Sequence, residues 1–192
     1  MKRKLKIIKV IFGVALLIGL ISFTVIKNAS RTVNKIDVAF VQPVDNYFIN
    51  DESIREIINK DGKDILKQSL RDVNVKEIEQ KVSESPFVDS VQVSKDINGH
   101  LRLDIKANSA VARIKTLKNE FYLTTKGGKM PLSKLNSADV ILVSGDVKPN
   151  ECEDLSKFVQ ALKADDLLKN HIIAIQKVGQ RSFNLIVNTG NY

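Results

Sequence analysis

The feature that most limits how this chain can fold is an uncharged run near its N-terminus. Residues 10–26, VIFGVALLIGLISFTVI, lie between Lys9 and Lys27 and contain no charged side chain. As a helix this run spans roughly 26 Å, and including Ile7 and Ile8 extends it to about 30 Å, the thickness of the hydrocarbon core of a bilayer. The run therefore predicts a transmembrane helix at 10–26.

A cleaved signal peptide is the alternative interpretation of this run. Signal peptides have an apolar stretch of about 7–15 residues that ends in a small-residue cleavage site, whereas here Thr24, Val25 and Ile26 follow. We therefore expect an uncleaved anchor. Five of the first nine residues are basic, against three in the nine after the run, and the more basic flank stays in the cytoplasm. The predicted topology is a cytoplasmic tail at 1–9 and an extracytoplasmic body after a linker at 27–35.

The positive charge of the chain is concentrated in the same region. The chain has 30 Lys and Arg against 22 Asp and Glu, a formal net charge of +8. Eight of the basic residues and none of the acidic ones lie in residues 1–35, so the basic residues that remain equal the 22 acidic ones in number. A neutral body lacks the positive field that binding to phosphate backbones requires. Nucleic acid is therefore not an expected partner.

Residues 36–107 show the pattern of a β-α-α-β-β module. A first strand is predicted at 36–41, where apolar and polar residues alternate. Two further strands are predicted at 88–95 and 101–107, and the Asn98-Gly99 pair between them favours a tight type I′ hairpin turn. We therefore expect the last two strands to pair antiparallel.

Two helices are predicted between the first and second strands. Asn50 or Asp51 can cap the first helix, and Asn74, with Glu77 at the third helical position, can cap the second, which ends before Pro86. Apolar residues recur at helical spacing in both and at a spacing of two in the strands. The expected buried positions are Ile54, Ile57, Ile58, Val75, Ile78, Val82, Val91, Val93, Leu101, Leu103 and Ile105.

Residues 108–192 predict a second, mainly β domain with one helix. Strands are expected at 111–117, 121–124, 140–143, 171–178 and 183–187, the last two as a hairpin around Gly179-Gln180. The helix has Asn150 and Glu153 as a capping pair and an apolar stripe at helical spacing, formed by Leu155, Phe158, Val159 and Leu162. The expected fold class is α+β: a transmembrane helix followed by these two domains.

The sequence offers no convincing catalytic or metal-binding constellation. His100 and His171 lie in different predicted domains, and Cys152 is the single cysteine, so neither a zinc site nor an internal disulfide is expected. Gly128-Lys129 resembles the end of a phosphate loop but lacks its other glycine and its hydroxyl residue. We expect no cofactor and no metal.

Two acidic clusters offer a competing interpretation, because paired carboxyl groups can hydrolyse glycosidic bonds. Asp51-Glu52 and the acidic residues of 151–154 fall in the first turns of predicted helices, where the helix dipole stabilises negative charge. Capping explains them more simply. We therefore predict that the protein is not an enzyme, with a membrane-tethered cell-wall enzyme that uses Glu153 or Asp154 as the alternative.

The unpaired backbone groups of an edge strand are the remaining candidate for binding a partner protein. A three-stranded sheet leaves edges whose unpaired amides and carbonyls can accept a strand from a partner. The predicted strands at 36–41 and 88–95 are the edge candidates, and Lys95 and Asp89 can protect the second by their charge. The sequence does not choose between the two, so partner-binding residues are not assigned.

Four features together resemble the FtsQ/DivIB family of bacterial cell-division proteins, whose first extracytoplasmic module is a POTRA domain. They are the basic tail with a single anchor, the run FINDESI at 48–54, the run VKEIEQKVSESPFVDSVQV at 75–93, and LRLDIK at 101–106 leading to Ala112-Arg113-Ile114. Residues 36–107 resemble the POTRA domain. Residues 108–192, with FYL at 121–123, Gly128, Pro131-Leu132 and VSG at 143–145, resemble the β domain that follows it.

The resemblance implies a non-enzymatic bitopic scaffold of the division septum in the bacterial cytoplasmic membrane. It implies FtsB- and FtsL-like partners and the septal peptidoglycan synthase, whose activity the scaffold regulates. The alternative is another POTRA-bearing protein, a binding or chaperone-like module of envelope assembly or secretion. Such modules usually precede a barrel, and no series of alternating segments of about ten residues follows here.

The chain departs from the family pattern in two places. The link between the domains reads Ala107-Asn108-Ser109-Ala110, without the family's usual charged residue and proline. The family also continues past the hairpin at 183–190 with further strands and a helix, where its partners commonly bind by strand addition. We therefore expect either that the β domain is incomplete at its C-terminus or that partner binding has moved.

Overall fold

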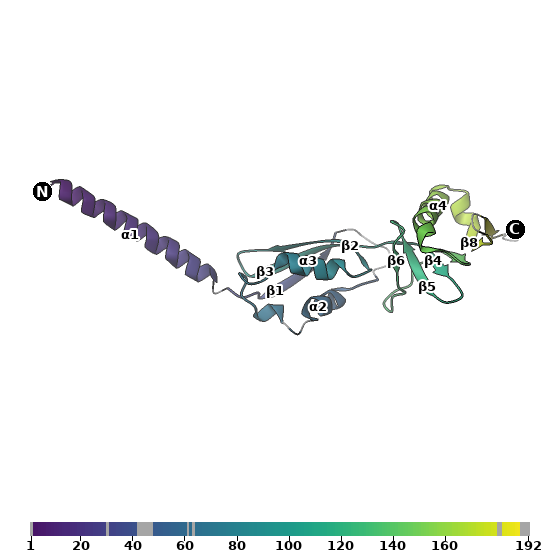
Figure 1. Cartoon of the computed structure of the whole chain (residues 1–192), viewed down its shortest axis with the longest axis horizontal. Coiled ribbons are helices and arrows are strands. Elements are labelled where there is room, and N and C mark those ends of the chain that lie inside the picture. Colours follow the sequence, from purple (N-terminus) through teal and green to yellow (C-terminus); the bar gives the residue numbers. More distant parts are fainter. Residues whose placement is uncertain are drawn as a thin grey trace.

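The computed structural model contains a long N-terminal helix followed by two sheets that succeed one another along the molecule (Figure 1). It describes residues 2–29, 31–41, 48–60, 62, 64–179 and 182–188, without the side chains of 2–8, 10 and 24–29. The first sheet has three strands and the second has six. The α+β class is therefore confirmed.

The N-terminal helix, α1, spans Lys2–Ala29. Its large apolar side chains between Ile11 and Phe23 are each more than half exposed. Among the described residues, none of the helices combines the length and the apolar character that crossing a membrane requires. The anchor at 10–26 therefore stays a prediction.

The first sheet confirms the β-α-α-β-β order and places its last strand in the centre. Its elements are β1 (Lys35–Phe40), α2 (Asp51–Asn59), the 3-10 helix η1 (Ile65–Lys67), α3 (Val75–Ser83), β2 (Val88–Lys95) and β3 (His100–Ala107). The strand order is β1-β3-β2, with β1 parallel and β2 antiparallel to β3. The return of the chain through two helices allows the parallel pairing of β1 with β3.

Both helices begin at predicted asparagines. Asn50 Oδ1 accepts a hydrogen bond from the amide of Ser53 at 2.9 Å, and Asn74 Oδ1 accepts one from the amide of Glu77 at 3.4 Å. Each bond satisfies one of the amides that a helix leaves free in its first turn. Of the two residues predicted as possible caps of α2, Asn50 is therefore the one that caps the helix.

The hairpin between β2 and β3 is antiparallel as predicted, but the predicted type I′ turn is wrong. That turn needs a positive φ at both central residues, and Asn98 does not have one, whereas Gly99 has a φ of 90°. The carboxylate of Asp96 accounts for the difference. Its Oδ1 accepts hydrogen bonds from the amides of Asn98 and His100, at 2.7 and 3.1 Å, and so stabilises a longer loop.

The core of the first sheet lies between β3 and the two helices. The predicted residues Leu101, Leu103 and Ile105 of β3 are fully buried, as are Ile54 of α2 and Val82 of α3. Burying a side chain of this size contributes about 1.5–3 kcal/mol. The central strand is therefore the element on which this sheet depends most.

The second sheet is mixed. Its elements are β4 (Ala110–Lys115), β5 (Glu120–Thr124), β6 (Lys129–Met130), β7 (Ile141–Ser144), the 3-10 helix η2 (Pro149–Glu151), α4 (Cys152–Ala164), α5 (Leu168–His171), β8 (Ile172–Lys177) and β9 (Phe183–Val187). The strand order is β6-β5-β4-β7-β8-β9, in which β7 is parallel to both neighbours and the other pairs are antiparallel. Helix α4 packs on the sheet through the predicted Leu155, Val159 and Leu162. The turn predicted at 179–180 lies partly outside the described residues.

Two details of the second sheet correct the sequence predictions. Asn150 and Glu153 do not cap α4, because η2 precedes it and the carboxylate of Glu151 accepts a hydrogen bond from the amide of Lys148 at 2.8 Å. His171 is not a strand residue, because it ends the short helix α5, which the sequence did not predict. Strand β6 was also not predicted.

Candidate functional site: the strand edges

Both strands predicted as edges of the first sheet are edges in the structure. Because β3 is central, β1 and β2 each have one side without a neighbouring strand in the described part of the chain. Such an edge can accept an extended segment of another protein where its outward amides and carbonyls are free. The side chains around each edge therefore decide which of them can bind.

The middle of the β2 edge is occupied by a side chain of α3. The amide of Val93 donates a hydrogen bond to Glu79 Oε1 at 2.8 Å. The amide of Asp96 bonds to the carbonyl of His100, so the alternation along the antiparallel pair directs the amide of Val93 away from β3. Glu79 therefore takes the position that the backbone of an added strand would need.

The two ends of β2 are also engaged. Asp89, at its beginning, forms ion pairs with Lys106 of β3 and with Lys126 in the turn between β5 and β6. Lys95, at its end, donates from Nζ to two carbonyls of the segment before α3, at 2.9 and 3.2 Å. These are the two residues expected to protect the edge by charge, and the charged groups of both are paired with other parts of the chain. The carboxylate that covers the strand, Glu79, was not identified from the sequence.

The β1 edge is less covered. Arg55 of α2 donates from Nη2 to the carbonyl of Ile36 at 2.5 Å. Lys35 and Asp37 form an ion pair at 2.6 Å along the strand, and both side chains are more than 40% exposed. This edge is therefore charged but only partly occupied.

The β9 edge of the second sheet is open and uncharged. β9 has no charged residue, unlike β1, β2 and β6, and its apolar side chains are between 36% and 51% exposed. Within the described residues no strand pairs with its outer side. The amide of Val178 bonds to the carbonyl of Ser182, so the alternation turns the backbone groups of Leu185 outward. The charges that usually protect an edge strand are therefore missing from β9 itself.

A groove adjoins this edge, between β9 and the beginning of α4. The ring of Phe183 stacks on that of Phe158 in α4, with centroids 6.1 Å apart. The groove has a volume of about 600 Å³ and is lined by Lys148, Asn150, Glu151, Asp154, Leu155 and the two rings. Its lining thus combines three apolar side chains with four polar or charged ones, and one of them, Phe183, belongs to the open strand.

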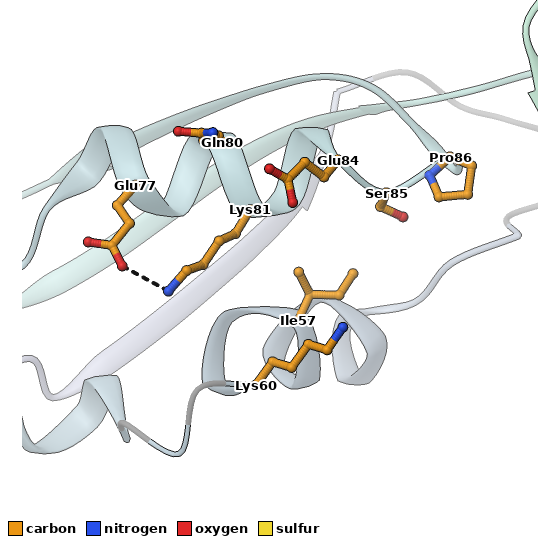
Figure 2. Close-up of a pocket in the computed structure, with 8 residues that line it drawn as sticks. All are labelled: Ile57, Lys60, Glu77, Gln80, Lys81, Glu84, Ser85 and Pro86. Carbon is orange, nitrogen blue, oxygen red and sulfur yellow. Dashed lines mark ion pairs between the residues drawn. The ribbon is translucent and has the colours of Figure 1, made fainter.

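A second groove separates α2 from α3 (Figure 2). It has a volume of about 680 Å³ and is lined by Ile57, Lys60, Glu77, Gln80, Lys81, Glu84, Ser85 and Pro86. Glu77 and Lys81 form an ion pair at 2.9 Å along α3. Because the lining combines two lysines with two glutamates, it has no net charge that would select an anionic or a cationic ligand.

Two of the acidic residues considered as catalytic groups, Glu151 and Glu153, have a lowered pKa. A hydrogen bond with Lys157, at 2.8 Å, lowers the pKa of Glu153. Hydrogen bonds with Lys177 and a backbone amide lower the pKa of Glu151. A general acid needs the opposite shift, produced by an apolar pocket. Glu151 and Glu153 therefore match the beginning of a helix better than a hydrolytic site.

The other titratable candidates do not converge on one place. His100 Nδ1 lies 3.7 Å from a carboxylate oxygen of Asp96, and His171 Nδ1 lies 2.6 Å from the carbonyl oxygen of Leu167. Cys152 is buried, and burial raises the pKa of its thiol. Among the residues whose placement is described, no group of His, Cys, Asp and Glu is positioned to hold a metal ion.

Two family models match the chain in consecutive segments. Residues 31–106, which contain the first sheet except Ala107 at the end of β3, match a POTRA-like domain. Residues 109–192, which contain the second sheet, match the C-terminal related domain of FtsQ/DivIB. No individual curated protein matches the chain significantly.

Proposed function

Because the chain is an FtsQ/DivIB-like protein, whose domains imply a role in cell division, we propose that it is a non-enzymatic scaffold of the bacterial division septum. In this role it links partner proteins and regulates septal peptidoglycan synthesis. The expected partners are FtsB- and FtsL-like division proteins and the septal peptidoglycan synthase.

The proposal includes a single membrane anchor at 10–26 with the N-terminus in the cytoplasm. It is supported by the uncharged run, by the basic residues that precede it, and by the exposure of the apolar side chains of α1 between Ile11 and Phe23. Chemical labelling of cysteines introduced at Ser22, Lys118 and Lys4 would test this topology. Only the residue at position 118 should react with an impermeant reagent added to intact cells whose outer layers are permeable to it.

The observation that carries the scaffold proposal is the contrast between the β2 and β9 edges. β2 is closed by Glu79 and by the contacts at its two ends, whereas β9 is apolar and open in the described structure. A strand added to β9 would gain backbone hydrogen bonds and cover its apolar side chains. Partners held in the same membrane have a high effective concentration, so a short strand contact suffices.

The experiment replaces one outward-facing backbone amide of β9. Leu185→Pro removes the amide hydrogen without removing a bond to β8, whereas Leu185→Ala shortens the side chain and keeps the amide. The protein is depleted in its host, each variant is resupplied, and cell length is measured. Circular dichroism of both purified variants verifies that the second sheet is folded.

Depletion should produce filaments with unseparated chromosomes. The unaltered chain and Leu185→Ala should restore normal length, and Leu185→Pro should not. Rescue by Leu185→Pro would exclude β9 as the docking edge, and no rescue by the unaltered chain would contradict the proposal that it carries the essential contacts. Normal cell length with defective envelope assembly would favour the alternative role in assembly or secretion, which the POTRA-like match also allows.

A further inference from the structure

A cluster of contacts between the two sheets forms what we call the seam, centred on Phe48. Phe48 precedes α2, yet it is only 4% exposed and does not belong to the core of the first sheet. It packs instead with Tyr122 of β5 and Met130 of β6, which are 1% and 0% exposed. The rings of Phe48 and Tyr122 lie with their centroids 5.2 Å apart. A large side chain of the first module is therefore buried in the second.

Polar contacts fix the position of this ring. The hydroxyl of Ser133 donates a hydrogen bond to the carbonyl of Phe48 at 2.9 Å. The hydroxyl of Tyr122 lies 3.0 Å from that of Ser137 and accepts a hydrogen bond from the amide of Ala138 at 3.1 Å. The segment after β6 is thus bonded both to Tyr122 and to Phe48, so it holds the two rings together.

An ionic contact forms a second part of the seam. The carboxylate of Asp89, whose side chain is only 10% exposed, pairs with Lys106 of β3 at 3.4 Å and with Lys126 in the turn between β5 and β6. Lys126 belongs to the second module and Asp89 to the first. One carboxylate, mostly shielded from water, therefore connects the two modules, and such a pair is weakened less by salt than an exposed one.

The connection between β3 and β4 adds a third contact. The amide of Asn108 bonds to the carbonyl of Phe87 at 2.9 Å, and its side-chain amide donates to the carbonyls of Pro86 and Val88 at 2.9 and 3.1 Å. The carbonyl of Ser109 accepts a hydrogen bond from the amide of Thr125 in the second module, at 3.3 Å. Both residues of the link are thus bonded to one module or the other.

From these three contacts we infer that the two modules form one rigid body, held by the seam at a single orientation. Domains joined by small polar interfaces usually move relative to one another. Here an aromatic side chain is buried across the interface, an ion pair flanks it and the link is hydrogen-bonded along its length. The protein is therefore a rigid spacer, in which the β9 edge keeps a fixed position relative to β1.

A distance measurement tests this rigidity directly. Spin labels on cysteines introduced at Gln92 in β2 and Ala161 in α4, both exposed, report the separation of the modules in the full chain in detergent micelles. Cys152 is buried and should not react. The unaltered chain should give one narrow distance distribution, and Phe48→Ala should give a broad one.

Phe121→Ala is the matched control, because Phe121 also lies on β5 but packs against the core of the second sheet rather than in the seam. It should leave the distribution narrow. A broad distribution in the unaltered chain, or a narrow one in Phe48→Ala, would overturn the inference. If Phe48→Ala does not fold, Lys126→Met decides the question: the Lys126 side chain is 69% exposed and lies outside both cores, so its loss should leave the modules folded and still broaden the distribution.

Discussion

Strands β2 and β9 are both edges, but their surroundings differ. The middle amide of β2 is bonded to Glu79, and the ends of the strand are engaged by Asp89 and Lys95. β9 has no such cover in the described structure, and its apolar side chains remain partly exposed. The difference teaches that position in a sheet does not by itself make an edge available. A helix packed on the sheet can close an edge with a single carboxylate.

The substitution with the largest expected effect destabilises the first sheet, which contains the β2 edge, and leaves the second sheet, which contains the β9 edge, largely unchanged. Leu103→Ala in β3 removes a fully buried side chain at the position paired with Val93 of β2, and it should lower the free energy of unfolding of the first sheet by about 2–5 kcal/mol. Hydrogen exchange of the amides of β2 should accelerate strongly, while that of β8 should change much less because the second sheet has its own core. Equal acceleration in both sheets would show that their cores are not independent.

A smaller change should open the closed edge. Glu79→Ala leaves the amide of Val93 without its acceptor, which should lower stability by about 1 kcal/mol and increase exchange of that amide about fivefold. Glu79→Gln keeps an oxygen at the same place and serves as the control. Unchanged exchange of Val93 in Glu79→Ala would mean that the carboxylate does not close the edge.

A third change modifies the open edge. Phe183→Ala removes the ring that stacks on Phe158 and should lower the stability of the second sheet by about 0.5 kcal/mol, the low end for an aromatic pair because the ring is partly exposed. Thermal unfolding followed by circular dichroism measures the effect. Leu117→Ala, at a fully exposed turn position, should cause no shift and controls for loss of a surface apolar group.

The smallest effect concerns pH. Burial raises the pKa of Asp89, but hydrogen bonds from Lys126 and Lys106 outweigh it, and the pKa is lowered. A carboxyl with a lowered pKa stabilises the folded state above its ordinary pKa, about pH 4, and this contribution is lost as the pH falls through the lowered value. Protection factors of the amides near the beginning of β2, which correct for the slower intrinsic exchange at low pH, should therefore fall on acidification in the unaltered chain. Asp89→Asn should remove this dependence, and a dependence that persists would assign it to another group.

Features that depend on neighbours in sequence could be predicted. Asn50 and Asn74 cap their helices because the side chain and the amide that it accepts from are three residues apart. The apolar residues of β3 were identified because a strand alternates by two, and its central position buried them fully. These signals are local, and they were sufficient for the order of elements in the first module.

Features that depend on distant contacts could not be predicted in the same way. In the sequence, Glu79 is one of several polar residues of a predicted helix. Only the packing of α3 on the sheet brings its carboxylate to the amide of Val93. In the sequence, Phe48 is a residue that precedes a predicted helix, and Tyr122, whose ring it contacts, is far along the chain. The type I′ turn was wrong for a local reason, since Asp96 competes for the amides of the loop.

The parallel pairing of β1 with β3 has a mechanical consequence. The chain enters β1 from the side of α1 and leaves β3 toward the second sheet. Tension between these two points pulls the strands in opposite directions along their length, so the six paired positions from Lys35 and His100 to Phe40 and Ile105 are loaded together in shear. Pulling β1 away from β3 then requires breaking the contacts at all six positions at once, whereas a force across the strands would break them one by one. The first module is thus built to bear load between its N-terminal helix and whatever the second sheet holds.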